Sequence, residues 1–528
     1  MRKEVIMSTY DYKALQNGSD IRGVALPGVP GEDVNLDAEA VTRLAGGFLY
    51  WLSSRTGKKP SELTVAVGRD SRSSGEDISG LFEGSLAARG VRTLDCGLAS
   101  TPAMFMATVF PEIQADGAVM VTASHLPWNR NGLKFFSADG GLDKGDITDI
   151  IVFAESSQIL NMMPAGTPSA PEETDLMSLY TAHLRNLIVK AVEGVDAPAP
   201  SGSTTGNAAG PQPLAGLKIA VDAGNGAGGF YATQVLAPLG ADVSASQFLD
   251  PDGTFPNHMP NPENKEAMAA IRQATLDGGC DLGLIFDTDV DRSSAVDEQG
   301  REISRNGIVA MAAALIAGDC PGTTVVTDSI TSNELTEYLE GALGLKHLRF
   351  KRGYRNVINK SMELNQAGTD SALAIETSGH AAYRENYFLD DGAYLATKIV
   401  IRTALLHREG KPISSLIADL KEPVESIEIR MPITAADFGA CADKALAAIS
   451  DLPAADTALT YEVVTPNYEG VRIAFRGPVN GWFLLRKSLH DPIMPLNIET
   501  DREGGAALVC ANLKAQLAGI EGLDTEKL

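Results

Sequence analysis

The sequence has few cysteines, few cations and no long apolar run, and each shortage excludes a class of protein. Five cysteines are scattered over 528 residues without a CxxC pair, which argues against a zinc site and is typical of free thiols in a reducing compartment. The formal net charge of −24 argues against a nucleic-acid partner and against an anionic membrane surface. The start of the chain lacks an apolar signal core, and no later segment is apolar for long enough to span a bilayer. We therefore expect a soluble cytoplasmic protein, and the sequence does not fix its oligomeric state.

A recurring pattern indicates the fold class. A short β-branched run, a polar loop with Gly, Asp or Ser, and a helix-like segment follow one another from residues 63, 217 and 324. Apolar strands that alternate with helices are typical of α/β layers with parallel or mixed sheets. A chain of this length is expected to form about three or four domains. We predict three related α/β domains and a smaller C-terminal α+β domain.

Composition suggests where these domains end. Residues 196–215 are rich in Pro, Gly, Ser and Ala and almost uncharged, as in a linker or exposed insertion. Further breaks are expected near Gly318–Gly322 and Lys421–Pro423, and the alternating run that follows the second break predicts a half-exposed strand. The predicted domain ranges are 1–195, 216–320, 321–423 and 424–528.

The most informative stretch is residues 118–136, where two apolar runs flank a polar loop. The runs predict two strands, and the Pro, Asn and Gly residues between them predict a loop displayed at the surface. This loop carries Ser124 beside His125, with Arg130 and Lys134 a few residues further on. A hydroxyl beside an imidazole, flanked by cations, suits phosphoryl transfer, because a nucleophile there needs a base and neutralisation of charge.

An acidic motif follows an apolar, buried-looking run in residues 282–294. Asp287, Asp289 and Asp291 occupy alternate positions, so an extended chain would direct the three carboxylates the same way. Converging carboxylates repel one another unless a cation lies among them, and hard oxygen ligands favour Mg²⁺. The motif therefore predicts a magnesium site.

Two other kinds of site have motifs similar to this one. A calcium-binding EF-hand needs Gly where Arg292 stands and a helix before the loop, so that interpretation fails. Residues 285–290 also match the first motif of haloacid-dehalogenase-type phosphatases, with Asp287 as nucleophile and Asp289 as acid/base. This second alternative gives the Ser124 loop no task.

Three further segments carry groups that suit a sugar phosphate. Glu376 and Ser378 follow one predicted strand and can orient sugar hydroxyls. Residues 350–355 place three cations around one glycine. Arg486 and Ser488 end another apolar run, and a guanidinium with a hydroxyl matches the oxygens of a phosphate.

Taken together and in this order, the segments resemble the α-D-phosphohexomutases, the phosphoglucomutase/phosphomannomutase family. The matching segments are Asp20–Gly23, Thr122–His125 with Asn131–Lys134, Asp287–Arg292, Glu376–His380 and Arg486–Asp491. They span nearly the whole chain. The resemblance implies four domains around a central active-site cleft, with one active-site loop from each domain.

The resemblance also implies roles for single residues. Ser124 would carry a phosphoryl group and, with Asp287, Asp289 and Asp291, bind Mg²⁺. The implied catalytic residues are Ser124, His125, Lys134, Arg22 and Arg292. The implied substrate-binding residues are Glu376, Ser378, His380, Lys351, Arg486, Ser488 and His490. The expected substrate is a glucose or mannose 1- or 6-phosphate, with hexose 1,6-bisphosphate as intermediate or activator.

The sequence departs from the family pattern at two places, and these leave alternatives open. Leu126 stands where the family has Asn, and Leu489 with His490 replaces the Gly-Thr of the last loop. If the altered last loop releases the bisphosphate, the enzyme becomes a hexose-1,6-bisphosphate synthase that needs a separate phosphoryl donor. A non-catalytic sugar-phosphate sensor is disfavoured, because binding alone needs no nucleophile beside a metal.

Overall fold

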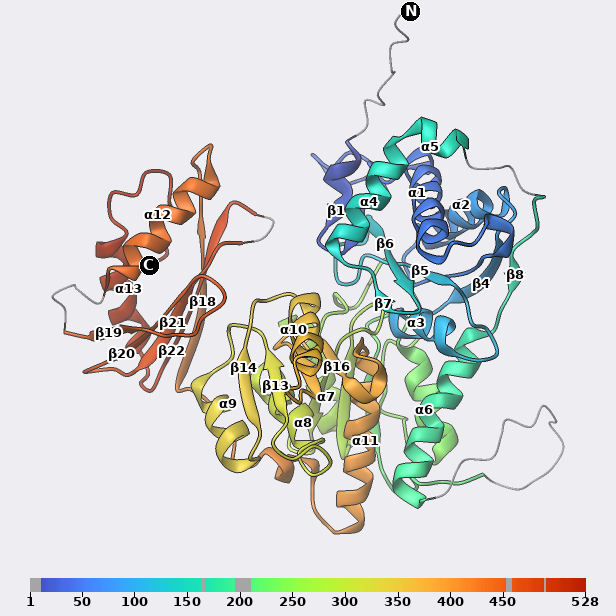
Figure 1. Ribbon diagram of the computed structural model, residues 1–528. Coiled ribbons are helices and arrows are strands. Elements are labelled where there is room, and N and C mark those ends of the chain that lie inside the picture. The colour runs from blue at the N-terminus through green and yellow to red at the C-terminus, as the bar shows by residue number, and fades with distance from the viewer. Residues whose placement is uncertain (1–10, 163–166, 195–209, 453–457, 489–490) are drawn as a thin grey trace, which may run out of the picture. The chain divides into compact units, whose positions relative to one another are not determined.

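The computed structural model describes residues 11–162, 167–194, 210–452, 458–488 and 491–528 (Figure 1). His490 lies outside the described residues, as does most of the predicted linker 196–215. The chain divides into two compact units: a first unit of Met1–Ser304 with Ser378–Leu416, and a second unit of Arg305–Thr377 with Ile417–Leu528. Both units contain helices and sheets, which confirms the predicted α/β class. The four domain ranges stay a prediction.

The first unit begins with a mixed sheet in the order β1-β2-β6-β5-β3-β4-β8, with β7 beside β6. The strands are β1 (Gln16–Asn17), β2 (Asp20–Val24), β3 (Thr64–Arg69), β4 (Arg92–Leu98), β5 (Gly117–Val121), β6 (Arg130–Ser137), β7 (Gly140–Gly141) and β8 (Glu172–Glu173). β5 runs parallel to β3 and antiparallel to β6. The predicted strand–loop–strand around Ser124 is therefore confirmed as β5, a connecting loop and β6.

Helices of the same region begin and end at residues that cap helices well. They are α1 (Ala38–Thr56), α2 (Gly75–Ala87), α3 (Thr101–Val109), α4 (Lys144–Glu155), α5 (Ser157–Met162) and α6 (Leu176–Glu193). The Asp37 carboxylate accepts a hydrogen bond from the Ala40 amide at the start of α1, and Gly57 ends that helix at φ 70°. The Ser100 hydroxyl caps α3 in the same way.

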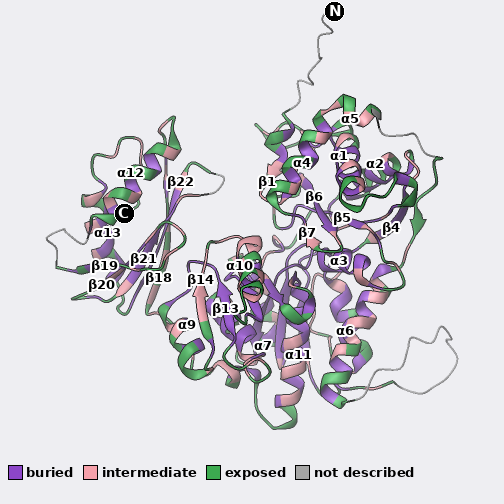
Figure 2. Ribbon diagram, in the orientation of Figure 1, coloured by how far each residue is buried: buried purple, intermediate pink, exposed green. Residues whose placement is uncertain are grey.

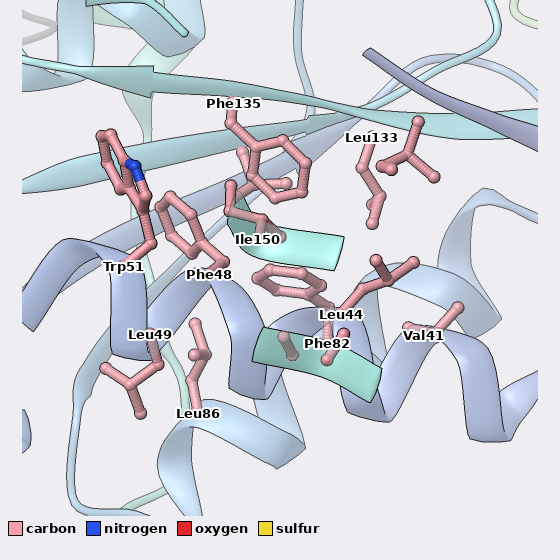
Figure 3. Packing of buried hydrophobic residues seen from close by; sticks show 14 of the residues in the cluster. Val41, Leu44, Phe48, Leu49, Trp51, Phe82, Leu86, Leu133, Phe135 and Ile150 are labelled. Atoms are coloured by element: carbon pink, nitrogen blue, oxygen red, sulfur yellow. The ribbon is translucent and has the colours of Figure 1, made fainter. Parts of the chain in front are cut away.

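Alternation along the strands sorts side chains onto the two faces of this sheet. Leu133 and Phe135 of β6 join a core with Phe48 of α1, Phe82 of α2 and Ile150 of α4 (Figure 3). Lys134 and Phe136 take the alternate positions, and Phe136 contacts Phe105 of α3. Lys134 thus lies on the face that α3 covers.

The remainder of the first unit contains a second sheet in the order β12-β11-β10-β9. Its strands are β9 (Ile219–Asp222), β10 (Leu282–Phe286), β11 (Ser293–Asp297) and β12 (Glu302–Ile303), accompanied by α7 (Lys265–Gly278). β10 and β11 pair antiparallel, so residues 287–292 form the turn of a hairpin. A hairpin of β16 (Ala381–Tyr383) and β17 (Leu389–Asp390) precedes α11 (Gly392–Arg408).

The second unit combines parallel and antiparallel strands. β13 (Thr324–Thr327) lies between β14 (Lys346–Arg349) and β15 (Leu373–Ile375), all parallel, with α8 (Asn306–Ala314), α9 (Asn333–Glu337) and α10 (Tyr354–Gln366). The C-terminal sheet is antiparallel, in the order β18-β22-β21-β20-β19. Its elements are β18 (Glu425–Pro432), β19 (Thr460–Val463), β20 (Val471–Arg476), β21 (Gly481–Leu485), β22 (Ile493–Thr500), α12 (Phe438–Ser450) and α13 (Gly505–Gln516).

Burial follows the predicted patterns. β5 and β13 are buried along their whole length, whereas exposed and half-buried residues alternate along most of β18, as predicted for residues 424–431 (Figure 2). Within the described part of the chain, every helix is too short or too polar to cross a bilayer.

Glu83 on α2 is a buried carboxyl group whose Oε1 has no hydrogen-bond partner among the described residues. Burial, followed by the charge of Asp95, raises the pKa of Glu83 from 4.5 to about 8. The folded state therefore binds more protons than the unfolded state between these two pKa values, and stability falls as the pH rises through that window. We expect Glu83→Gln to remove this loss and to raise the free energy of unfolding at about pH 9 by about 2 kcal/mol. Urea unfolding at about pH 4 and pH 9 measures it, and an unchanged pH dependence would contradict it.

Candidate active site

Ser124 lies at the start of the loop between β5 and β6, and it is only 6% exposed. The prediction that the loop is displayed at the surface is wrong for Ser124 but right for His125, Pro127 and Trp128, which are exposed. The serine hydroxyl donates to Asp287 Oδ2 at 2.9 Å and accepts from Arg292 Nη2 at 3.0 Å. The serine thus faces the acidic turn between β10 and β11.

The sequence predicts that the three aspartates lie in an extended chain, and this prediction is wrong. They converge because they lie in the turn between β10 and β11. Val290, in the middle of the turn, has φ 67°, which a β-branched residue rarely adopts. Its carbonyl accepts a hydrogen bond from the amide of Gly392 at 3.1 Å. A Cβ on Gly392 would lie 2.5 Å from the Arg292 carbonyl carbon, so only glycine lets the start of α11 approach this closely.

Two helix N-termini support the acidic turn. Thr101, the first residue of α3, donates from its amide to the Asp289 carbonyl at 2.8 Å and from its hydroxyl to Asp289 Oδ2 at 2.5 Å. The N-terminus of α11 lies against residues 290–292, as described above. Helix N-termini carry partial positive charge, which stabilises nearby carboxylates.

The electrostatics of the turn favour a bound cation. Burial and the charges of Asp291 and Asp289 raise the pKa of Asp287 well above its usual value. One ligand atom from each aspartate can lie within 4.8 Å of the others. Asp289 Oδ1 and Asp291 Oδ1 are buried and, within the described residues, accept no hydrogen bond. Three buried carboxylates, two of them with an oxygen that accepts no hydrogen bond among the described residues, suit a hard divalent cation such as Mg²⁺.

Lys134 on β6 contacts this turn directly. Its ammonium donates to Asp289 Oδ2 at 2.8 Å and also to Asp291 Oδ2. Burial alone would lower the pKa of Lys134, but these two carboxylates outweigh burial and raise it well above the usual value. Lys134 therefore holds its proton in this arrangement.

Arg292 connects the acidic turn with Ser124 and His125. Besides the serine hydroxyl, its Nη2 lies 2.6 Å from His125 Nδ1 and its Nε lies 3.1 Å from Asp287 Oδ2. The positive charge of Arg292, and then desolvation of the ring, lower the pKa of His125 to about 2. His125 Nδ1 thus accepts a hydrogen bond from the guanidinium, and its low pKa makes the ring a weak base.

Arg22 on β2 lies near the same loop. Its Nη1 donates to the Thr122 carbonyl at 2.5 Å and its Nη2 to Asp20 Oδ2 at 2.8 Å. Its charge contributes to lowering the pKa of His125. The structure therefore places Arg22 with the other predicted catalytic residues in the first unit.

His380, predicted to bind the sugar, lies beside the acidic turn. It pairs with Arg292 in an isolated β-bridge, and its Nδ1 is 2.5 Å from Asp390 Oδ2 and 3.8 Å from Asp291 Oδ1. Burial would lower the pKa of His380, but the two carboxylates outweigh burial and raise it to about 9. Ser378, two residues earlier, is buried.

The other predicted substrate residues lie in the second unit. Lys351 is exposed, and Gly353 two residues later donates its amide hydrogen to Glu376 Oε1 at 2.7 Å. Arg486 is buried; burial, then the charge of Arg352, lowers its pKa. Ser488 is half-buried, and its hydroxyl accepts from the Asp491 amide at 3.2 Å. The predicted sugar loop spans the boundary of the two units, since Glu376 belongs to the second and Ser378 and His380 to the first.

Sequence reasoning missed several residues that support the site. Asp390 and Thr101 hold His380 and Asp289, and Arg72 contacts the Ser124 loop. The Ser-Thr-Pro run at residues 100–102 is a helix-start signal, which points to a helix N-terminus but not to its partner. The partners are 10 to 188 residues apart in the sequence, so spacing alone does not reveal them.

Comparisons with known proteins agree with these features. Three sequence profiles match the chain: phosphoglucomutase/phosphomannomutase alpha/beta/alpha domain I at residues 13–156, domain II at 206–300 and domain III at 304–424. A phosphomannomutase/phosphoglucomutase of Pseudomonas putida is 27% identical over 476 residues, covering 89% of this chain and 92% of that one. A phosphoglucosamine mutase of Corynebacterium jeikeium is 28% identical over 477 residues, covering 88% and 91%. The crystal structure of a phosphoglucomutase/phosphomannomutase family protein from Burkholderia thailandensis superimposes with a TM-score of 0.70 at 26% identity, covering 95% of this chain and 97% of that one.

Proposed function

Because the chain belongs to the phosphoglucomutase/phosphomannomutase family of isomerase-type phosphosugar mutases, we propose that it interconverts a hexose 1-phosphate and a hexose 6-phosphate through a phosphoserine. Ser124 is the proposed phosphoryl carrier. The observation that carries this proposal is the contact of its hydroxyl with both Asp287 and Arg292. A carboxylate of the proposed metal site and a guanidinium thus meet at one nucleophile.

The proposed reaction has two transfers. A hydroxyl of the hexose phosphate attacks the phosphorus on Ser124, the bond from phosphorus to Oγ breaks, and a hexose 1,6-bisphosphate forms. The bisphosphate then presents its other phosphate, Ser124 Oγ attacks it, and the product hydroxyl takes up a proton. Each half releases one proton and consumes one, so no further reactant is needed.

Residues of the first unit suit these steps. Arg292 and Arg22 would bind the phosphate oxygens near Ser124. His380, held by Asp390 beside Asp291, would contact the substrate, whereas Nδ1 of His125 accepts a hydrogen bond from Arg292. Mg²⁺ held by Asp287, Asp289 and Asp291, with Ser124 as a further ligand, would neutralise charge that develops on the transferred phosphoryl group.

Residues of the second unit are proposed to bind the substrate. Glu376 would accept hydrogen bonds from sugar hydroxyls, together with Ser378 of the first unit, and Lys351 would contact the substrate. Arg486 and Ser488, with His490 from the same loop, would bind the phosphate that is not transferred. This leaves the hexose itself open, because the relatives named above include mutases of glucose, mannose and glucosamine phosphates.

The test is a mutase assay with Mg²⁺ and a catalytic amount of hexose 1,6-bisphosphate. Glucose, mannose and glucosamine 1-phosphates are supplied separately, and formation of the 6-phosphate is followed. We expect conversion of at least one of them with no net consumption of the bisphosphate. Absence of conversion for all three would contradict the proposal.

A second candidate is a hexose-1,6-bisphosphate synthase, favoured by Leu489 and His490 in the place of the family's Gly-Thr. In that case free bisphosphate would accumulate in proportion to a separate phosphoryl donor. The phosphatase with Asp287 as nucleophile is less favoured, because it leaves the contact between Asp287 and Ser124 without a purpose.

A further inference from the structure

Arg72 is an arginine with a fully buried side chain, in the loop between β3 and α2. Its Nη2 donates to the carbonyl oxygens of Ser124 at 2.5 Å and Leu126 at 2.6 Å. Its Nη1 donates to those of Pro127 at 2.7 Å and Arg130 at 3.0 Å. One guanidinium therefore gathers four carbonyl groups from one seven-residue stretch.

These carbonyl groups would repel one another without a cation among them, so the loop conformation depends on Arg72. Ser124 itself has φ 48°, a conformation that L-residues seldom adopt and that surrounding contacts must maintain. Its carbonyl is bound by Arg72, and its amide donates to the Thr122 hydroxyl at 2.8 Å. Both peptide groups of the serine are thus fixed, which fixes the direction of its Cα–Cβ bond, and the contacts with Asp287 and Arg292 then orient Oγ.

Asp70 holds Arg72 and Thr122 together. Its carboxylate accepts from the Arg72 amide at 2.9 Å and from the Thr122 hydroxyl at 2.6 Å, and it lies 3.4 Å from Arg72 Nε. Asp70 and the Arg72 side chain are completely buried. Water therefore does not compete for the hydrogen bonds that these two side chains make.

Residues 253–255, which precede the acidic turn in the sequence, pack against Arg72 and its loop. The Phe255 ring lies 5.2 Å from Arg72 Cζ. A Cβ on Gly253 would lie 2.7 Å from Arg72 Cα and closer still to the backbone of Ser73, so this segment touches the Arg72 loop directly. Arg72 is thus in contact with both the Ser124 loop and the chain segment 253–255.

We propose that Arg72 is a positioning residue: it holds Ser124 in the geometry in which Oγ meets Asp287 and Arg292, and residues 253–255 hold Arg72 in place. The proposal rests on the proposed function of Ser124 as phosphoryl carrier. Arg72 acts only through the loop and does not contact the substrate.

Arg72→Lys is the first variant, because lysine keeps the charge but offers one nitrogen in place of a planar fork. We expect phosphorylation of Ser124 by hexose 1,6-bisphosphate in a single turnover to slow by about 10²-fold, with KM for the hexose phosphate changed by less than about 3-fold. Hydrogen exchange of a peptide covering residues 122–132 should become at least about 10-fold faster, while the remaining peptides keep their protection. Arg69→Lys is the matched control, since Arg69 ends β3 and pairs at 3.9 Å with a largely exposed Glu76.

Two further variants separate positioning from folding. Gly253→Ala leaves Arg72 unchanged but displaces the segment that covers it, and it should give the same local exchange and slower phosphorylation. Arg72→Ala should regain part of its phosphorylation rate in millimolar guanidinium, which a folding defect would not. Wild-type exchange and wild-type phosphorylation in Arg72→Lys would overturn the proposal, as would a uniform loss of protection along the chain without guanidinium rescue. If the wild-type protein does not phosphorylate Ser124, the proposed function fails, while the exchange measurement still decides whether Arg72 holds the loop.

Discussion

Replacing Ser124 with alanine is expected to lower kcat of the mutase reaction by at least about 10³-fold, because no phosphoryl carrier remains. The alanine loses only a hydroxyl that contacts Asp287 and Arg292, so the fold should persist. The measurement is 6-phosphate formation in the presence of Mg²⁺ and hexose 1,6-bisphosphate, with thermal unfolding to check the fold.

Ser85→Ala is the matched control for this experiment. Ser85 lies on α2, where its hydroxyl donates to the Leu81 carbonyl at 2.7 Å, and it is not part of the proposed site. We expect its kcat to equal that of the wild type. A Ser124→Ala enzyme that keeps more than about a tenth of the activity would contradict a serine carrier and favour Asp287 as nucleophile.

Asp291→Asn is expected to have the second large effect. Asp291 lies against Lys134, His380 and Arg292, and these cations outweigh the effect of burial and lower the pKa of Asp291. It is therefore ionised at neutral pH and available to a metal. We expect the amide to lower kcat by at least about 10²-fold, since charge neutralisation at the transferred phosphoryl group is weakened.

Metal binding gives this prediction a readout other than activity. At a Mg²⁺ concentration near 100 times the dissociation constant, binding should stabilise the wild type by about 2.7 kcal/mol and raise Tm by several degrees. The Asp291→Asn protein should lose most of this shift, while Asp277→Asn, an exposed aspartate on α7, should keep it. An undiminished Mg²⁺ shift in Asp291→Asn would contradict the assignment of the metal site.

The sequence predicted the strands around the Ser124 loop, the strand before the acidic turn and the half-exposed strand β18, because these depend on local apolar patterns. It also predicted several residues that the structure brings together around the acidic turn, namely Ser124, Lys134 and Arg292, since their types and order along the chain are specific. The convergence of Asp287, Asp289 and Asp291 was predicted for the wrong reason. They meet because β10 and β11 form a hairpin, and the pairing of two strands is a tertiary property.

What the sequence did not predict depends on contacts between distant segments. His125 was expected to transfer protons, but its environment could not be known without the position of Arg292, 167 residues later. The burial of Ser124 and its hold by Arg72 likewise follow from packing of the β3–α2 loop against the β5–β6 loop. The position of His380 beside Asp390 and Asp291 depends on the bridge between residues 292 and 380, which no local pattern encodes.

The central claim is that Ser124 carries the phosphoryl group, and peptide mass spectrometry that locates the phosphate tests it most directly. The protein is incubated with Mg²⁺ and a hexose 1,6-bisphosphate and digested, and the peptides containing residues 118–136 and residues 282–294 are sequenced with and without hydroxylamine treatment. We predict one hydroxylamine-stable phosphate on Ser124. An unmodified Ser124 with hydroxylamine-labile phosphate on Asp287 would contradict the claim.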